Sequence, residues 1–92
     1  MTSDLKPLTV IQTGRRMREM RMALINQIAD HLAQYDLTQT EMAMLLGISR
    51  PRLNRLLHKD AALFAIDALL TIAVRAGMTV HLQVARRYRH PG

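Results

Sequence analysis

The sequence predicts an all-α domain, a bundle of about four to five helices followed by a short C-terminal β-strand. From Arg15 onward, apolar residues recur at steps of three and four, the period of an amphipathic helix. After Gly77 the period changes to two, as in a half-buried strand. The 92 residues, 49% of them hydrophobic, suffice for one modest core. We therefore expect an N-terminal arm at 1–14, one domain at 15–85 and a basic tail at 86–92.

The first helix is predicted from Arg15 to Tyr35. Its apolar stripe passes through Met17, Met20, Leu24, Ile28 and Leu32. Its first turns also carry four arginines, at a helix end where the dipole disfavours cations: Arg15, Arg16, Arg18 and Arg21. This placement does not stabilise the helix, so it indicates either a solvated face or an additional phosphate contact.

A short second helix is predicted at about residues 39–46. Thr38 suits its N-cap, and Glu41, three residues later, completes a capping box. Gly47 suits the left-handed position that ends a helix. The sequence therefore marks both ends of this helix.

The third helix is predicted to begin after Ser49 and to reach about His58. Ser49 is its expected N-cap, and Pro51 is tolerated in the first turn because the missing N–H would have no partner there. A connection over residues 59–63 leads to a fourth amphipathic helix from about Ala65.

The segment from Met78 to Val84 alternates apolar and polar residues and predicts a β-strand. A lone strand has unpaired backbone N–H and C=O groups and is not stable by itself. The simplest partner is the same strand of a second copy, related by a two-fold axis. We therefore expect a homodimer with Val80, Leu82 and Val84 in its interface, and a frayed C-terminal extension is the alternative.

The second and third helices have the spacing of a helix-turn-helix over residues 38–57. Ala43 is small where the helices must approach closely, and Gly47 permits the tight turn between them. Their shared core is expected to contain Met42, Leu46, Ile48, Leu53 and Leu56, and Leu57 is expected to point inward as well. Each element alone is weak evidence, but their joint occurrence is specific.

The outer side of the third helix is basic and is predicted to enter the major groove of DNA. Arginine suits bidentate contact with guanine, and asparagine suits adenine. Gln39, at the start of the second helix, would either bond a phosphate oxygen or begin the helix without a partner. The expected DNA-binding residues are Gln39, Ser49, Arg50, Pro51, Arg52, Asn54, Arg55 and Lys59. The alternative is an ordinary solvated face of an amphipathic helix.

The charge balance also favours double-stranded DNA as the partner. Thirteen Lys and Arg against seven Asp and Glu give a net charge of +6, which attracts polyanions. No segment is apolar over the length that spans a bilayer, no secretory leader is recognisable and no cysteine is present, so we expect a cytoplasmic protein. The four histidines lack metal-ligand spacing and no catalytic motif is recognisable. We expect no cofactor and no enzymatic activity.

Several short motifs occur together from Leu37 to Val84, namely LTQ, Ala43, LLGIS, Leu53 and the run FAIDALL…AG. This combination resembles the Xre family of phage-repressor-like regulators, and within it the small HigA-type antitoxins. The resemblance implies a phage-repressor-like bundle, contact of Gln39 with the DNA backbone, and base reading by Arg50, Pro51 and Arg55. Family members usually carry glycine near positions 58–60 and a Ser or Thr cap at position 65, and this chain has neither.

Three functions follow from these observations. The first is a sequence-specific transcriptional regulator, a repressor that binds a pseudo-palindromic operator as a homodimer. The second, which the resemblance motivates, is an antitoxin that neutralises a partner toxin and autoregulates its operon. The third, a basic helix on an anionic membrane, does not explain the spacing of Ala43, Gly47 and Leu53, and we expect no membrane partner.

Overall fold

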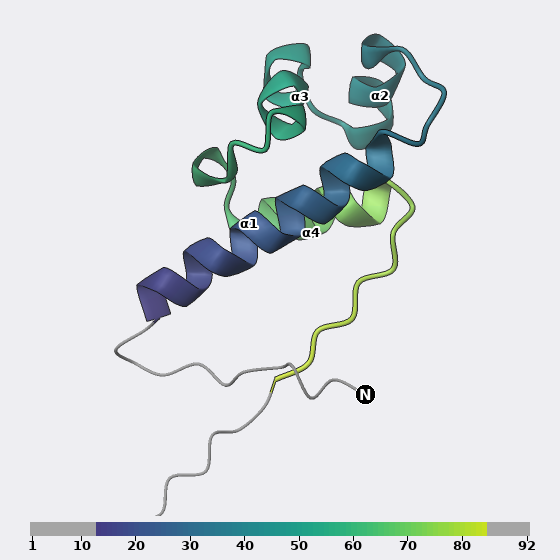
Figure 1. Ribbon diagram of the computed structural model, residues 1–92. Coiled ribbons are helices and arrows are strands. Elements are labelled where there is room, and N and C mark those ends of the chain that lie inside the picture. Colours follow the sequence, from purple (N-terminus) through teal and green to yellow (C-terminus); the bar gives the residue numbers. More distant parts are fainter. Residues whose placement is uncertain (1–12, 85–92) are drawn as a thin grey trace, which may run out of the picture.

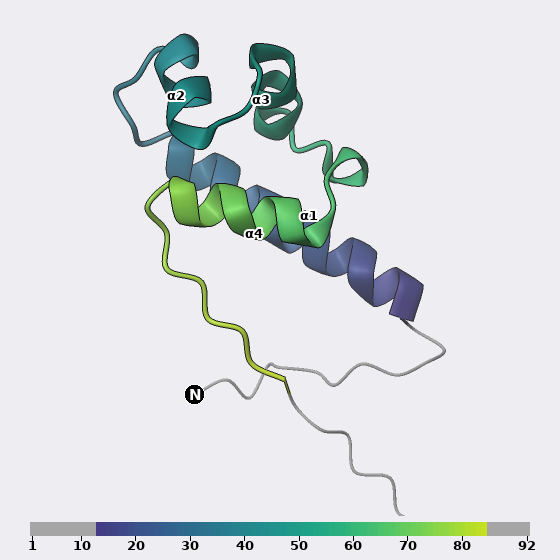
Figure 2. The same cartoon turned by 180° about the vertical axis from the view of Figure 1, so that it is seen from behind.

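The computed structural model describes residues 13–84, which contain four α-helices and one 3₁₀ helix. These elements are α1 (Thr13–Leu32), α2 (Gln39–Leu46), α3 (Arg50–Leu57), η1 (Ala61–Leu63) and α4 (Ile66–Arg75). Helices α1 and α4 lie side by side, and α2 and α3 sit together on one side of this pair (Figures 1 and 2). The predicted all-α bundle is confirmed.

The core is formed by apolar side chains from all four α-helices and from the segment around η1. The largest fully buried side chains are Ile25, Ile28, Leu32, Leu46, Leu53, Leu56, Phe64 and Leu69. No polar or charged side chain is buried in the described part of the chain. In the first half of α1, Met17, Met20 and Leu24 are only half-buried. The first turns of α1 extend past the start of α4 (Figure 1).

The boundaries of α1 differ from the predicted ones. The helix begins at Thr13, so it includes the last two residues of the predicted N-terminal arm. It ends at Leu32, three residues before Tyr35, because the following turn tightens and Tyr35 N–H donates to the Leu32 carbonyl at 3.0 Å. The remainder of the arm (1–12) and the predicted basic tail (86–92) lie outside the described residues.

The C-terminal ends of α1 and α4 are joined by polar side chains. The Tyr35 hydroxyl donates to the Ala76 carbonyl, and His31 Nε2 lies 3.0 Å from the same oxygen. His31 Nε2 also lies 2.9 Å from the Tyr35 hydroxyl. A carbonyl at the end of α4, which has no partner within its own helix, thus contacts two side chains of the segment that ends α1.

Helices α2, α3 and α4 end in the same way. Each is followed by a residue in the left-handed conformation, Gly47 (φ 70°), Lys59 (φ 61°) and Gly77 (φ 86°). In each case the residue that follows the left-handed one donates its N–H to the carbonyl five positions earlier, as Asp60 does to Arg55 at 3.1 Å. This is the Schellman motif, in which glycine is usual because it lacks a Cβ atom.

Lys59 is the exception among these three turns. A non-glycine residue in this conformation costs roughly 1–2 kcal/mol. The Lys59 ammonium lies 3.2 Å from the carboxylate of Asp30 on α1, so the side chain joins the turn to the first helix. The left-handed turn after α3 is therefore formed by a lysine rather than a glycine.

The β-strand predicted at residues 78–84 is absent from the described chain, and this prediction is wrong for a single copy. Met78 and Val80 are half-buried against the core, whereas Leu82 is 75% and Val84 84% exposed. A strand requires a neighbour for its backbone hydrogen bonds, and residues 13–84 provide no second extended segment to pair with it.

Candidate nucleic-acid interface

The junction of α2 and α3 has the geometry that its sequence predicts. Ala43 is buried, and Gly47 adopts the left-handed conformation directly after α2. Arg75 of α4 approaches this turn and donates from Nη1 to the Leu46 carbonyl at 3.1 Å. A Cβ atom at Gly47 would clash with the Arg75 guanidinium. Gly47 therefore permits both the left-handed turn after α2 and the close approach of Arg75 from α4.

The first turns of α2 and α3 are capped as predicted. The Thr38 N–H donates to Glu41 Oε1 at 2.9 Å, and the Glu41 N–H donates to Thr38 Oγ1 at 3.1 Å, which completes the capping box. Ser49 Oγ accepts from the Arg52 N–H at 3.2 Å, and Pro51 lies in the first turn of α3. The Ser49 hydroxyl, which was also a DNA-binding candidate, thus caps α3.

Helix α3 turns one side to the core and the other to solvent. Leu53 and Leu56 are fully buried and Leu57 is half-buried, so these three side chains hold α3 against the bundle. The opposite side is exposed and forms what we call the recognition surface, made of Arg50, Pro51, Asn54 and Arg55.

Arg50 connects the recognition surface to the start of α2. Its Nη1 donates to Thr40 Oγ1 at 2.8 Å, and its Nη2 donates to Gln39 Oε1 at 3.4 Å. Gln39 and Arg50, eleven residues apart in sequence, are therefore neighbours in the fold. The sequence did not identify Thr40 as part of this group, because the contact depends on the crossing of two helices and has no local signature.

Residues 12–85 match the model of a protein family described as a helix-turn-helix domain. The chain belongs to this helix-turn-helix family. Among curated proteins, none matches the chain significantly. The family assignment supports a DNA-binding regulator.

In this helix-turn-helix domain, two of the predicted DNA-binding residues point away from the recognition surface. The Arg52 guanidinium lies over the Phe64 ring, 4.3 Å from the ring centroid, at the end of the η1 segment. Lys59 pairs with Asp30 on α1. The structure therefore brings Gln39 together with Arg50, and it places Arg52 and Lys59 on the flanks of α3.

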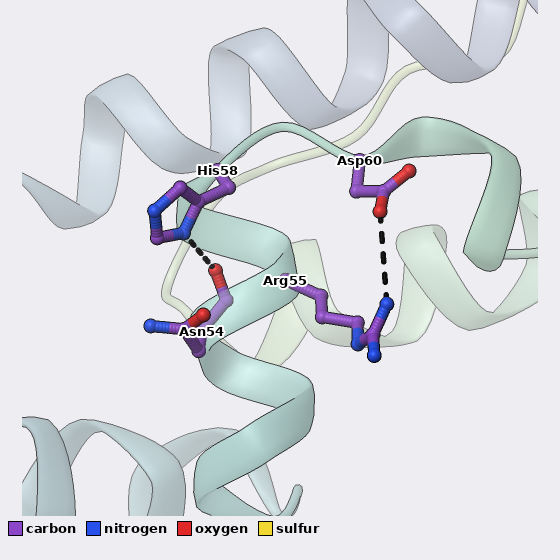
Figure 3. Close-up of polar contacts among 4 residues, drawn as sticks. All are labelled: Asn54, Arg55, His58 and Asp60. Atoms are coloured by element: carbon purple, nitrogen blue, oxygen red, sulfur yellow. Dashed lines mark hydrogen bonds and ion pairs between the residues drawn. The ribbon is translucent and has the colours of Figure 1, made fainter.

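The C-terminal end of α3 carries a further group of polar contacts (Figure 3). His58 Nδ1 lies 2.7 Å from the Asn54 carbonyl, one turn earlier in the helix. Arg55 extends toward Asp60, and its Nη1 lies 3.9 Å from Asp60 Oδ2. Asp60 is the one acidic residue between Glu41 and Asp67, and the sequence analysis did not single it out.

The described part of this domain has neither a metal site nor a membrane span. Residues 13–84 contain no cluster of three or more His, Cys, Asp or Glu side chains that could hold a metal ion. None of the described helices combines the length and the apolar character that crossing a membrane requires.

Proposed function

We propose that this helix-turn-helix protein is a sequence-specific transcriptional repressor that binds double-stranded DNA as a homodimer. The observation that carries the proposal is the exposed basic side of α3, which Arg50 joins to Gln39 at the start of α2. In a helix-turn-helix the second helix of the motif lies in the major groove, and the first crosses the backbone. By occupying a promoter, such a dimer excludes other DNA-binding proteins from it.

The recognition surface offers side chains suited to base edges. Arg55 carries a fork of N–H donors that matches guanine O6 and N7, and the Asn54 amide can both donate to and accept from adenine. At the start of α2, backbone N–H groups and the Gln39 amide would bond a phosphate oxygen. In this arrangement α2 fixes the register and α3 distinguishes sequences.

Substitution of Arg50 or Arg55 by alanine is expected to weaken operator binding by about 1–3 kcal/mol each and to relax specificity. The loss has a physical cause, since each arginine would contribute charge-assisted hydrogen bonds to DNA. The operator is first selected from a random duplex pool, and affinities are then measured by fluorescence anisotropy at one fixed salt concentration.

The matched control is Arg18→Ala, which removes the same charge from the first turns of α1. These turns lie far from α2 and α3 (Figures 1 and 2). The control is expected to retain the base preferences of the unchanged protein. Unchanged operator affinity in both Arg50→Ala and Arg55→Ala would show that α3 does not read the DNA.

The proposal of a dimer rests on residues 78–84, the segment after α4. Its apolar residues lie at alternate positions, and beyond Val80 they leave the core, so Leu82 and Val84 are exposed. Pairing this segment with its copy about a two-fold axis would satisfy its backbone and cover both side chains. Two α3 helices would then face half-sites about 10 bp apart, or a multiple of that.

The double variant Leu82→Asp/Val84→Asp is expected to be monomeric at micromolar concentration, where the unchanged protein is dimeric. Carboxylates at these positions would repel one another across the two-fold axis and would oppose apolar burial. Sedimentation equilibrium measures the mass. The control, Thr79→Asp/Gln83→Asp, places the same charges on the other side of the segment and is expected to remain dimeric. A monomeric unchanged protein would contradict the dimer.

A second candidate function is that of an antitoxin that also binds a partner toxin. It is favoured by the first turns of α1, where arginines and methionines, both common in protein interfaces, make up seven of the eight residues 15–22. Arg15, Arg18 and Met22 are exposed there. Purification of the protein with a second small protein, and loss of that protein from Arg15→Ala/Arg18→Ala, would support this candidate. DNA as the sole co-purifying molecule would count against it.

A further inference from the structure

We propose that Asp60 is a positioning residue that orients Arg55 and thereby sets the base preference of α3. The inference rests on the proposed DNA-binding function and assigns a role to a residue outside the recognition surface. Asp60 itself would touch no base. It would act through the Arg55 guanidinium, which lies beside it (Figure 3).

The backbone after α3 places Asp60 beside Arg55. Lys59 adopts the left-handed conformation, which turns the chain back toward the helix. The Asp60 N–H then donates to the Arg55 carbonyl at 3.1 Å, so the two residues are joined by main-chain hydrogen bonding. Their side chains also meet, with Arg55 Nη1 3.9 Å from Asp60 Oδ2. The ion pair is therefore a consequence of a defined turn.

Stability does not account for this acidic residue. The side chains of Arg55 and Asp60 are 60% and 46% exposed, and ion pairs between such exposed groups contribute little to folding. An anion at the C-terminal end of a helix is also disfavoured by the helix dipole. Asp60 forms no side-chain hydrogen bond that caps η1. The negative charge of Asp60 therefore acts mainly on the Arg55 guanidinium beside it.

The pair can determine how Arg55 approaches DNA. An arginine contacts guanine best when its planar guanidinium presents two N–H groups side by side. The Asp60 carboxylate, 3.9 Å from one edge of the guanidinium, favours orientations that keep this edge toward it and leaves the remaining N–H groups for a base. The same carboxylate repels nearby phosphates, which opposes non-specific contact of this end of α3 with the backbone. Asp60 would therefore favour the specific contact over the non-specific one.

The test compares base preferences of the unchanged protein with those of Asp60→Asn, by selection from a random duplex pool and by titration of single-base variants of the operator. Arg55→Ala first identifies the base pair that Arg55 reads. At that base pair, Asp60→Asn is expected to lose about threefold to tenfold in discrimination. Its affinity for random duplex is expected to be unchanged or higher, because a negative charge near the phosphates has been removed. A residue needed only for folding would lower both affinities.

Two further variants make the outcome decisive. Asp60→Glu keeps a carboxylate and is expected to restore part of the discrimination. Asp67→Asn removes an exposed carboxylate from the first turn of α4 and is expected to change nothing at the Arg55 base pair. Melting curves establish that each variant is folded.

Three results would overturn the proposal. The first is an unchanged preference in Asp60→Asn, and the second is an equal loss at all operator positions. The third is a loss confined to a base pair that Arg55→Ala leaves unaffected, which would mean that Asp60 reads a base directly. If the unchanged protein selects no sequence at all, the proposed function fails, and that result is distinct from these three.

Discussion

Replacing Phe64 with alanine is expected to lower the free energy of unfolding by about 3–5 kcal/mol. Phe64 is 2% exposed and is one of the largest fully buried side chains of the described core. Its removal leaves a cavity between η1 and the helices, and it deprives Arg52 of the ring against which its guanidinium lies. Small domains are stable by only about 5–15 kcal/mol, so this change removes a large part of the total.

Urea denaturation followed by circular dichroism measures the effect of Phe64→Ala. The neighbouring substitution Leu63→Ala is the matched control, because Leu63 is 45% exposed and loses less apolar burial on truncation. It is expected to cost about 1 kcal/mol or less. Equal midpoints for the two variants would contradict the packing described here for the segment after η1.

Gly47→Ala is expected to destabilise the domain by about 2–3 kcal/mol, through two separable effects. An alanine at φ 70° incurs the cost of the left-handed conformation, roughly 1–2 kcal/mol. Its Cβ atom would also displace the Arg75 guanidinium, which donates to the Leu46 carbonyl. Loss of that hydrogen bond accounts for about another 1 kcal/mol.

A double-mutant cycle with Arg75→Ala separates the two effects of Gly47→Ala. Once Arg75 is absent, Gly47→Ala is expected to cost only the conformational part, since no guanidinium remains to be displaced. Thermal or urea unfolding of all four proteins gives the coupling energy. If the two changes in unfolding free energy were strictly additive, the hydrogen bond of Arg75 to the Leu46 carbonyl would not depend on the glycine at position 47.

The elements that the sequence predicted well are those with local chemical signals. Thr38 and Glu41 mark the start of α2 and Gly47 its end, and the observed helix has the predicted bounds. Ser49 marks the start of α3 in the same way. Caps and left-handed glycines act within one turn of helix, so the residues that determine them are adjacent in sequence.

The features that the sequence did not predict depend on distant residues. Contacts of Arg50 with Thr40 and of Arg75 with Leu46 arise from helix crossings. The left-handed turn at Lys59 could not be predicted, because no glycine occupies that position. The alternation after Gly77 has the period of a strand, but the strand it predicted does not form in residues 13–84. It could not supply the second strand that the backbone would need.

The position of α4 in the chain has a consequence for the order of folding. Helices α2 and α3 have eight residues each, too few to persist as isolated helices in water. The layer beneath them needs α4, whose Leu69, Ile72 and Ala73 complete the core and which is the last helix of the described chain to be synthesised. During translation, α3 therefore leaves the ribosome after α1 but before α4, the second helix of the layer on which the motif packs. A nascent chain that ends before Ile66 has the residues of the motif but lacks the packing that gives them their shape.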